Sequence, residues 1–119
     1  MGMQKKNLAK PDESRPFAKG KIDVVKVGDL TFGKATFEPG WKWSECVKPI
    51  AKTASCMVHH NGYVVSGRMR IKMDDGSETE VGPGDVFVCP PGHDAWIVGN
   101  EACVAIDFGA SVGQYAKSG

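Results

Sequence analysis

The sequence predicts an all-β fold of short antiparallel strands, arranged as a sandwich or a barrel. Two observations favour this class. About nine or ten short apolar or alternating stretches follow one another, and turns rich in Gly, Pro, Asp or Asn separate them. No stretch of useful length has the 3.6-residue apolar period of an amphipathic helix. With 119 residues, the chain has room for one domain with one core.

The amino-terminal part predicts an arm followed by a hairpin. Residues 1–20 hold several lysines and prolines but few large apolar side chains, so we expect a flexible arm that buries too little surface to order itself. Residues 22–27 are mostly β-branched, and the Gly-Asp turn signal at 28–29 separates them from a second apolar stretch at 30–37. We therefore expect a single domain over residues 21–110 that begins with a β-hairpin, and a small polar tail over residues 111–119.

Two tryptophans follow the chain break at Pro39-Gly40. Trp41 and Trp43 would share one face of a strand, because strand side chains alternate between the two faces of a sheet. They either cap the core or form an aromatic wall beside a ligand pocket. The next stretch, residues 44–53, predicts a loop.

The middle of the chain gives the clearest strand patterns. Residues 54–60 predict a strand with Cys56 and His60 on one face and His59 on the other. Residues 63–73 alternate with a period of two, and Gly67 marks a bend or turn within them. The side chains expected to share the inward face are Tyr63, Val65, Met69, Ile71 and Met73.

The remaining strands are short and separated by tight turns. The Asp-Asp-Gly sequence at residues 74–76 is typical of a hairpin turn, because glycine tolerates the positive φ that such turns require. Further strands are expected at residues 77–81, 85–89, 95–98 and 102–108.

Composition argues against several classes of function. Fifteen basic and fourteen acidic residues leave a net charge of +1 without a long basic block, so we expect no nucleic-acid partner. No apolar stretch approaches the roughly 20 residues that cross a bilayer, and no hydrophobic run follows the amino terminus, so we expect a cytoplasmic protein without a membrane partner. The four widely spaced cysteines are expected to be reduced thiols, although their even number also permits a disulfide. Two of them lie inside apolar stretches and are expected to serve only in packing: Cys89 and Cys103.

Glycine and proline residues in the stretch 81–96 form a recognisable motif. Gly84, Pro90 and Gly92 follow the order Gly, five residues, Pro, any residue, Gly. From about residue 36 to residue 108, the chain resembles the cupin superfamily, whose second motif has this spacing. The resemblance implies a jelly-roll barrel, also called a double-stranded β-helix, built from antiparallel strands.

The resemblance also places the metal-ligand positions of the family on this chain. The histidine position of the second motif falls on Ala95, and His93 lies two residues earlier. With the first motif anchored on Gly67, its glutamate position falls on His60 and one of its histidine positions on Cys56. The scaffold of the family is therefore present, while its usual set of three histidines and one glutamate is not.

Three of these residues are candidate metal ligands: Cys56, His60 and His93. His93 has the same strand parity as position 95, so its ring could reach the same cavity. A thiolate beside imidazoles favours zinc, iron or copper over magnesium or manganese. Each residue also has a simpler interpretation, as a small buried thiol, a core histidine bonded to a carbonyl, or a loop histidine. A fourth ligand could come from Glu45, Cys46 or Asp94.

Two functions fit this combination of fold and residues. The first is a small cupin that binds a metal ion, a small molecule, or both inside the barrel mouth. The alternative is a metal-dependent cupin enzyme, of the oxygenase or isomerase type, that uses an ion held by one cysteine and two histidines. The resemblance further implies a homodimer. The ligand pocket is expected to be lined by Trp41, Trp43, Tyr63, Met69, Phe87 and Trp96.

Overall fold

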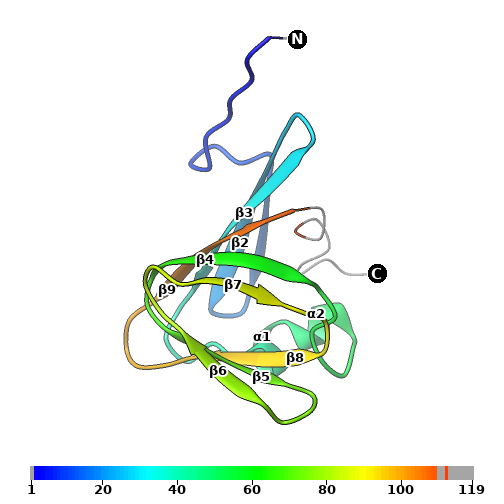
Figure 1. The fold of residues 1–119 in the computed structure, drawn as a ribbon, viewed down its shortest axis with the longest axis vertical. Coiled ribbons are helices and arrows are strands. Elements are labelled where there is room, and N and C mark those ends of the chain that lie inside the picture. The colour runs from blue at the N-terminus through cyan, green and yellow to red at the C-terminus, as the bar shows by residue number, and fades with distance from the viewer. Residues whose placement is uncertain (1, 110–111, 113–119) are drawn as a thin grey trace.

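The structure, a computed structural model, describes residues 2–109 and residue 112. The described residues form nine short strands and two one-turn helices (Figure 1). In chain order these are β1 (Glu13–Phe17), β2 (Gly20–Val27), β3 (Leu30–Phe37), α1 (Trp43–Cys46), α2 (Lys48–Ala51), β4 (His60–Ser66), β5 (Met69–Met73), β6 (Glu78–Val81), β7 (Val86–Cys89), β8 (His93–Ile97) and β9 (Cys103–Phe108).

The strands form two sheets that enclose the core. The larger sheet has the order β1-β2-β3-β9-β4-β7 and the smaller one the order β6-β5-β8. Every strand pair is antiparallel. The predicted all-β jelly roll is therefore confirmed. Buried side chains from both sheets meet between them, among them Ile22, Phe37, Val64, Met69, Ile71 and Ile97.

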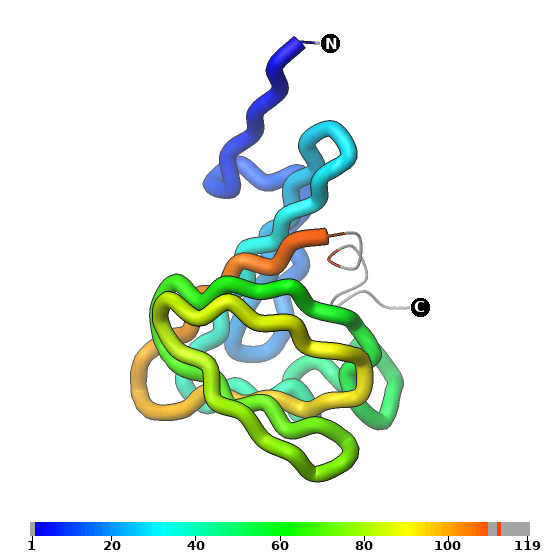
Figure 2. Tube along the Cα trace, in the orientation of Figure 1, coloured from blue at the N-terminus to red at the C-terminus, as the bar shows by residue number. Residues whose placement is uncertain are grey.

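The predicted hairpin of β2 and β3 is present, and it extends beyond the rest of the barrel (Figure 2). Its turn contains Gly28 with a φ of 57°. The Gly28 N–H donates a hydrogen bond to the side-chain oxygen of Gln4 at 3.0 Å, so the amino-terminal residues contact the tip of the hairpin.

One part of the expected arm forms a strand. Residues 13–17 pair with β2 as β1, and the Phe17 ring lies 6.0 Å from the Phe37 ring. The sequence hides this strand because Pro16 and two charged residues interrupt the apolar alternation; a proline is compatible with an edge strand such as β1. The flexibility of the arm stays a prediction. The tail expected over 111–119 lies outside the described residues, except for Val112.

The prediction of a strand over residues 54–60 is wrong. Strand β4 begins only at His60, and Cys56 forms an isolated bridge with His93 instead. The Cys56 N–H donates to the His93 carbonyl at 2.7 Å, and the Gly92 N–H donates to the Cys56 carbonyl at 2.8 Å. These bonds fasten the segment before β4 to the start of β8. Cys56 and His60 therefore lie close together without alternating along one strand.

The segment after Pro39-Gly40 also differs from the expectation. Trp43 begins helix α1 rather than continuing a strand, and α2 follows at Lys48–Ala51 inside the stretch expected as a loop. Pro49 lies in the first turn of α2, where its missing N–H removes no helical hydrogen bond. Both tryptophans are nevertheless buried, each with a relative exposure of 2%.

Gly67 divides the stretch 63–73 into two strands of different sheets. Strand β4 ends at Ser66 in the larger sheet, and β5 begins at Met69 in the smaller one. The division reverses the inward parity, because Val64 is buried before the glycine whereas Met69 is buried after it. The single inward face expected over this stretch is therefore wrong, and Tyr63 is 41% exposed.

Gly67 gives a stability prediction. Its φ is +76°, and a Cβ atom there would lie 2.3 Å from the backbone oxygen of Ala102. Because both the backbone conformation and the space exclude a side chain, we expect Gly67→Ala to lower the free energy of unfolding by about 3 kcal/mol. Chemical denaturation measures this change. Gly84→Ala is the matched control, since Gly84 has a φ of +90° with nothing near its Cβ position; its loss should be only about 1 kcal/mol. Equal losses would contradict the role of the close backbone contact.

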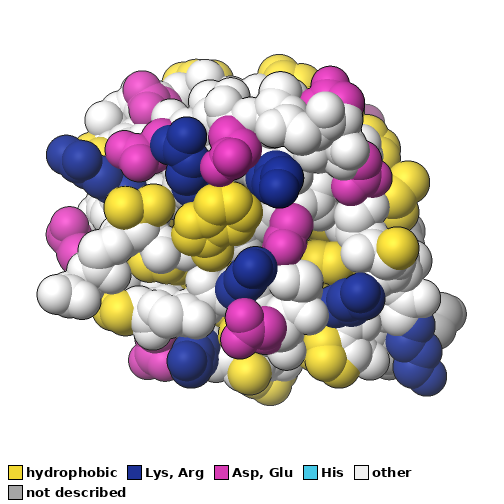
Figure 3. Space-filling model, turned by 90° about the horizontal axis from the view of Figure 1, so that it is seen from below, with side chains coloured by type: hydrophobic (Ala, Val, Ile, Leu, Met, Phe, Trp, Pro, Cys, Tyr) yellow, Lys and Arg dark blue, Asp and Glu magenta, His cyan; other side chains and the backbone are white. Residues whose placement is uncertain are grey.

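The outer face of the smaller sheet carries charges of both signs (Figure 3). Arg70 pairs with Glu78 at 2.9 Å and lies 3.9 Å from Glu80. The edge strand β7 of the larger sheet exposes two apolar side chains, those of Val86 and Val88. Among the described residues, no helix is long and apolar enough to cross a membrane. The expected homodimer stays a prediction.

Candidate metal centre and adjoining cavity

Three side chains from different segments meet at one end of the barrel. Cys56 lies in the coil before β4, His60 begins β4, and His93 begins β8. Their potential ligand atoms all lie within 4.8 Å of one another. The Cys56 Sγ is 3.7 Å from the His60 Nε2, and the two imidazole centroids are 5.2 Å apart. The three residues named from the sequence are therefore a cluster in space.

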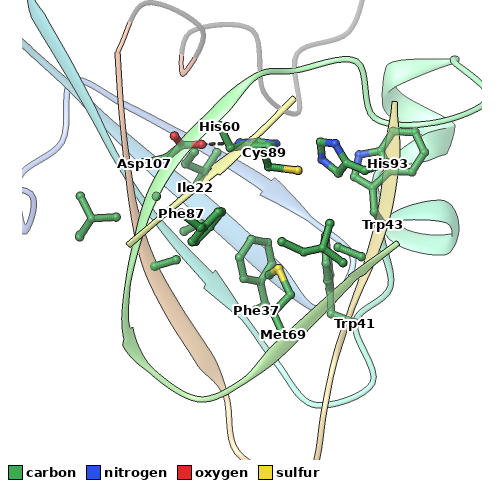
Figure 4. Close-up of a pocket in the computed structure, with 16 residues that line it drawn as sticks. Ile22, Phe37, Trp41, Trp43, His60, Met69, Phe87, Cys89, His93 and Asp107 are labelled. Carbon is green, nitrogen blue, oxygen red and sulfur yellow. Dashed lines mark hydrogen bonds and ion pairs between the residues drawn. The ribbon is translucent and has the colours of Figure 1, made fainter. Parts of the chain in front are cut away.

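A buried carboxylate orients the first imidazole. The His60 Nδ1 donates to the Asp107 Oδ2 at 2.5 Å (Figure 4). Asp107 is 8% exposed and lies on β9, which pairs with β4. Its other oxygen accepts the backbone N–H of Asn61 at 3.0 Å. With Nδ1 engaged in this way, His60 presents Nε2 to the Cys56 thiol.

A backbone carbonyl orients the second imidazole. The His93 Nδ1 lies 2.9 Å from the carbonyl oxygen of Pro90. Because a carbonyl only accepts hydrogen bonds, Nδ1 must carry the proton, and Nε2 is the nitrogen left for a metal. The Pro-Pro-Gly turn makes this contact, with Gly92 at a φ of +93°. The turn that identifies the cupin motif thus also fixes the tautomer of His93.

The donor set fits a transition metal ion. In a tetrahedral zinc site, the usual bond lengths place a sulfur and a nitrogen ligand about 3.5 Å apart, close to the 3.7 Å between Cys56 and His60. Metal-ligating histidines commonly donate their second nitrogen to a carboxylate or a backbone carbonyl, and both arrangements occur here. A thiolate with two imidazoles suits zinc, iron or copper. The cluster therefore has the composition and the orientation of a metal centre with three protein ligands.

Burial and mutual contacts set the protonation of the metal-free cluster. Burial raises the thiol pKa of Cys56, but hydrogen bonds and positive charge from the two histidines outweigh this effect and lower the pKa to about 6. Burial lowers the pKa of His60, but Asp107 and Cys56 raise it to about 9. Burial also lowers the pKa of His93, but Cys56 and Cys89 raise it to about 10. At neutral pH the metal-free cluster is thus a thiolate beside two imidazolium rings.

A cavity of about 50 Å³ adjoins the two histidines. Figure 4 shows His60, His93 and Cys89 toward one end of it and Phe37, Met69 and Trp41 toward the other. Most of its wall is apolar. A volume of this size is well below the roughly 300–1,000 Å³ of a pocket for a drug-sized ligand. The cavity can therefore accept a small molecule whose donor group approaches the metal centre.

Four of the six residues expected to line a ligand pocket do line this cavity: Trp41, Trp43, Met69 and Phe87. Tyr63 and Trp96 do not. Tyr63 lies outside because Val64 faces inward on β4. Trp96 alternates on β8 with the inward-facing residues and lies under the Lys42 amine, which is 5.6 Å from its ring centroid.

Two residues that lie at the metal centre were not predicted from the sequence. Asp107 has a signal that could have identified it, because it is the only acidic residue in the apolar stretch 102–108 and shares parity with the inward Cys103 and Ala105. Cys89 was assigned to packing alone; it is buried, but it also lines the cavity and raises the pKa of His93. Cys89 lies only four residues before His93, whereas no short spacing connects Asp107 to the candidate ligands.

An antiparallel jelly roll with polar side chains gathered at one end of its interior defines a protein of the cupin fold. A family model described as the EutQ-like cupin domain matches residues 41–105, which is more than half of the chain. This chain therefore belongs to the EutQ-like cupin family. No match was found among curated proteins.

Solved structures resemble the chain at low sequence identity. A protein of unknown function from Rhizobium leguminosarum has a TM-score of 0.63 at 20% identity, with 91% of this chain and 96% of that chain covered. The polyketide cyclase RemF from Streptomyces resistomycificus has a TM-score of 0.63 at 16% identity, with 90% and 78% covered. A cupin-like protein from Thermotoga maritima has a TM-score of 0.56 at 17% identity, with 82% and 73% covered. At these identities the likeness shows the fold alone.

Proposed function

We propose that this chain binds one divalent transition metal ion through Cys56, His60 and His93, and a small molecule in the adjoining cavity. The observation that carries the proposal is the orientation of both imidazoles. Each uses Nδ1 to donate to a fixed acceptor and so keeps Nε2 for a metal. Zinc is the first candidate because it tolerates three protein ligands with an open fourth position, and iron and copper are the other two.

An ion held by these three residues would act as a Lewis acid toward an oxygen or sulfur donor of the ligand. The protein contributes the orientation of the two histidines through Asp107 and Pro90, and an apolar wall that excludes water from the ligand. The enzymatic alternative, an oxygenase or isomerase, uses the same site and differs only in that the bound molecule is transformed.

Elemental analysis of the purified protein tests the metal site. We expect near-stoichiometric zinc, iron or copper in the unchanged protein, purified without chelators. Cys56→Ala and His60→Ala should each lose it, with a fall in affinity larger than the roughly 10–100-fold that loss of a supporting hydrogen bond costs. His59→Ala is the matched control, because His59 lies outside the cluster.

Thermal unfolding provides the second readout. A metal that binds only the native state must raise the melting temperature of the metal-free protein, and the two ligand variants should lose this rise. If the unchanged protein is metal-free and added zinc, iron and copper leave its melting temperature unaltered, the proposed metal site is wrong.

A further inference from the structure

The cavity beside the metal centre is polar at only one end. Its polar lining groups are the imidazoles of His60 and His93, the carboxylate of Asp107 and the thiol of Cys89. The remainder of the lining that the structure describes consists of aliphatic, aromatic and glycine residues, without lysine, arginine, hydroxyl or amide side chains. Apart from the indole N–H of Trp41, the described lining therefore offers polar partners only at the end where the metal ligands lie.

The far end of the cavity is lined by apolar side chains and has no charged side chain from the part of the chain that the structure describes. Phe37, Trp41 and Met69 lie there, and all three are at least nine-tenths buried (Figure 4). The indole Nε1 of Trp41 is buried and has no hydrogen-bond partner among the described residues. A single N–H donor cannot balance a carboxylate or a phosphate, and it can bond only one of several sugar hydroxyls.

The size of the cavity limits the ligand as well. A volume of about 50 Å³ lies well below the roughly 300–1,000 Å³ of a pocket for a drug-sized ligand, so only a short compound fits it. A molecule of this size whose far end is charged or hydroxylated would have to bury that end against rings and methyl groups. Burying a polar group without a partner weakens binding strongly, and burying a charge weakens it more.

We propose that the site takes a short apolar compound with a single oxygen or sulfur donor group, and that it rejects dicarboxylates, phosphorylated compounds and sugars. This inference rests on the proposed function, because the metal ion provides the anchor for the donor group. The apolar far end selects the rest of the molecule.

Three thiols of equal size test the inference on the unchanged protein loaded with cobalt(II). They are 3-methylbutane-1-thiol, 3-mercaptopropanoate and 3-mercaptopropanamide, which share the thiol and differ only in an isopropyl, carboxylate or amide end. Titration is followed by the absorption of the cobalt ion, under argon, with the cobalt content measured before and after. We expect 3-methylbutane-1-thiol to bind at least about tenfold more tightly than 3-mercaptopropanoate. It should also bind more tightly than 3-mercaptopropanamide, whose NH2 group finds no acceptor among the described side chains at the far end even where its carbonyl accepts the Trp41 N–H.

The outcomes separate the inference from the proposed function. Equal or tighter binding of the carboxylate or the amide would overturn the inference. So would the absence of binding by all three thiols when cobalt is stoichiometric, and the proposed metal site would then still stand. Failure to take up cobalt, zinc, iron or copper would overturn both.

A cavity-filling variant provides an independent arm. Ala35 is 5% exposed and lines the cavity. It lies on β3, a strand that carries none of the candidate metal ligands. Ala35→Leu should abolish binding of 3-methylbutane-1-thiol without changing the cobalt stoichiometry, whereas Val86→Leu, at a 71% exposed position outside the cavity, should change neither. If Ala35→Leu binds the thiol normally, the cavity is not the binding site. Should that variant fail to fold, the comparison of the three thiols still decides the question.

Discussion

Replacing Asp107 with asparagine is expected to weaken metal binding by about 10–100-fold, although Asp107 would not touch the ion. The carboxylate accepts two hydrogen bonds, one from the His60 Nδ1 and one from the Asn61 N–H. An amide has a single acceptor oxygen, so Asp107→Asn must lose one of these bonds. It also loses the negative charge that makes the His60 imidazole a stronger ligand. Competition with a chromophoric chelator measures the affinity.

A second buried aspartate provides the control for this prediction. Asp23 is 7% exposed, accepts a hydrogen bond from Ser14 at 2.7 Å, and lies on β2 away from the cluster. Asp23→Asn should change stability but leave the metal affinity as it is. An Asp107→Asn variant that binds metal as tightly as the unchanged protein would show that the His60–Asp107 bond does not support a metal ligand.

The strands that could be predicted are those bounded by glycine turns. The hairpin of β2 and β3 was found because Gly28 marks its turn, and the predicted strands at residues 85–89 and 102–108 correspond closely to β7 and β9. These stretches combine β-branched and aromatic residues with turn residues at each end. Local patterns are therefore sufficient to locate such strands, even where the strand pairs with partners distant in the sequence, as β7 and β9 do.

Side-chain direction could not be predicted across Gly67. Period-two alternation assumes one continuous strand, whereas the chain passes from the larger sheet to the smaller one at this glycine. The assignment of Tyr63 to the pocket failed for this reason, while Met69, beyond the glycine, lines the cavity as expected. Only the pairing of β4 with β9 and of β5 with β8 fixes which residues face inward.

The sequence predicted the candidate metal ligands of the site, but it did not predict the residues that hold these ligands in place. Cys56 and His60 were named from motif positions, and they do lie together, although through a bridge to His93 rather than through a strand. Asp107 is separated from His60 by 47 positions and reaches it because β9 inserts between β3 and β4. Strands that are distant in the sequence bring these two residues together, so no short sequence motif contains both of them.

Metal binding at pH 7.5 is expected to release two protons per ion. With a pKa of about 6, Cys56 is already a thiolate, whereas His60 and His93, with pKa values of about 9 and 10, each hold a proton on the nitrogen that the metal must occupy. Ordinary pKa values of 9.0 for the thiol and 6.5 for the imidazoles would instead release one proton, from the cysteine. The affinity should therefore rise about 100-fold per pH unit between pH 7 and 8, rather than about tenfold.

Calorimetric titration with zinc in two buffers of different ionisation enthalpy counts these protons. Asp107→Asn provides an internal check, because it removes the carboxylate that raises the pKa of His60 and should reduce the release at pH 7.5 from two protons toward one. His59→Ala, whose imidazole lies outside the cluster, should leave the count at two. Release of a single proton by the unchanged protein would mean that the metal-free cluster is a neutral thiol beside neutral imidazoles. The contacts that join Cys56, His60 and His93 would then be too weak to outweigh burial.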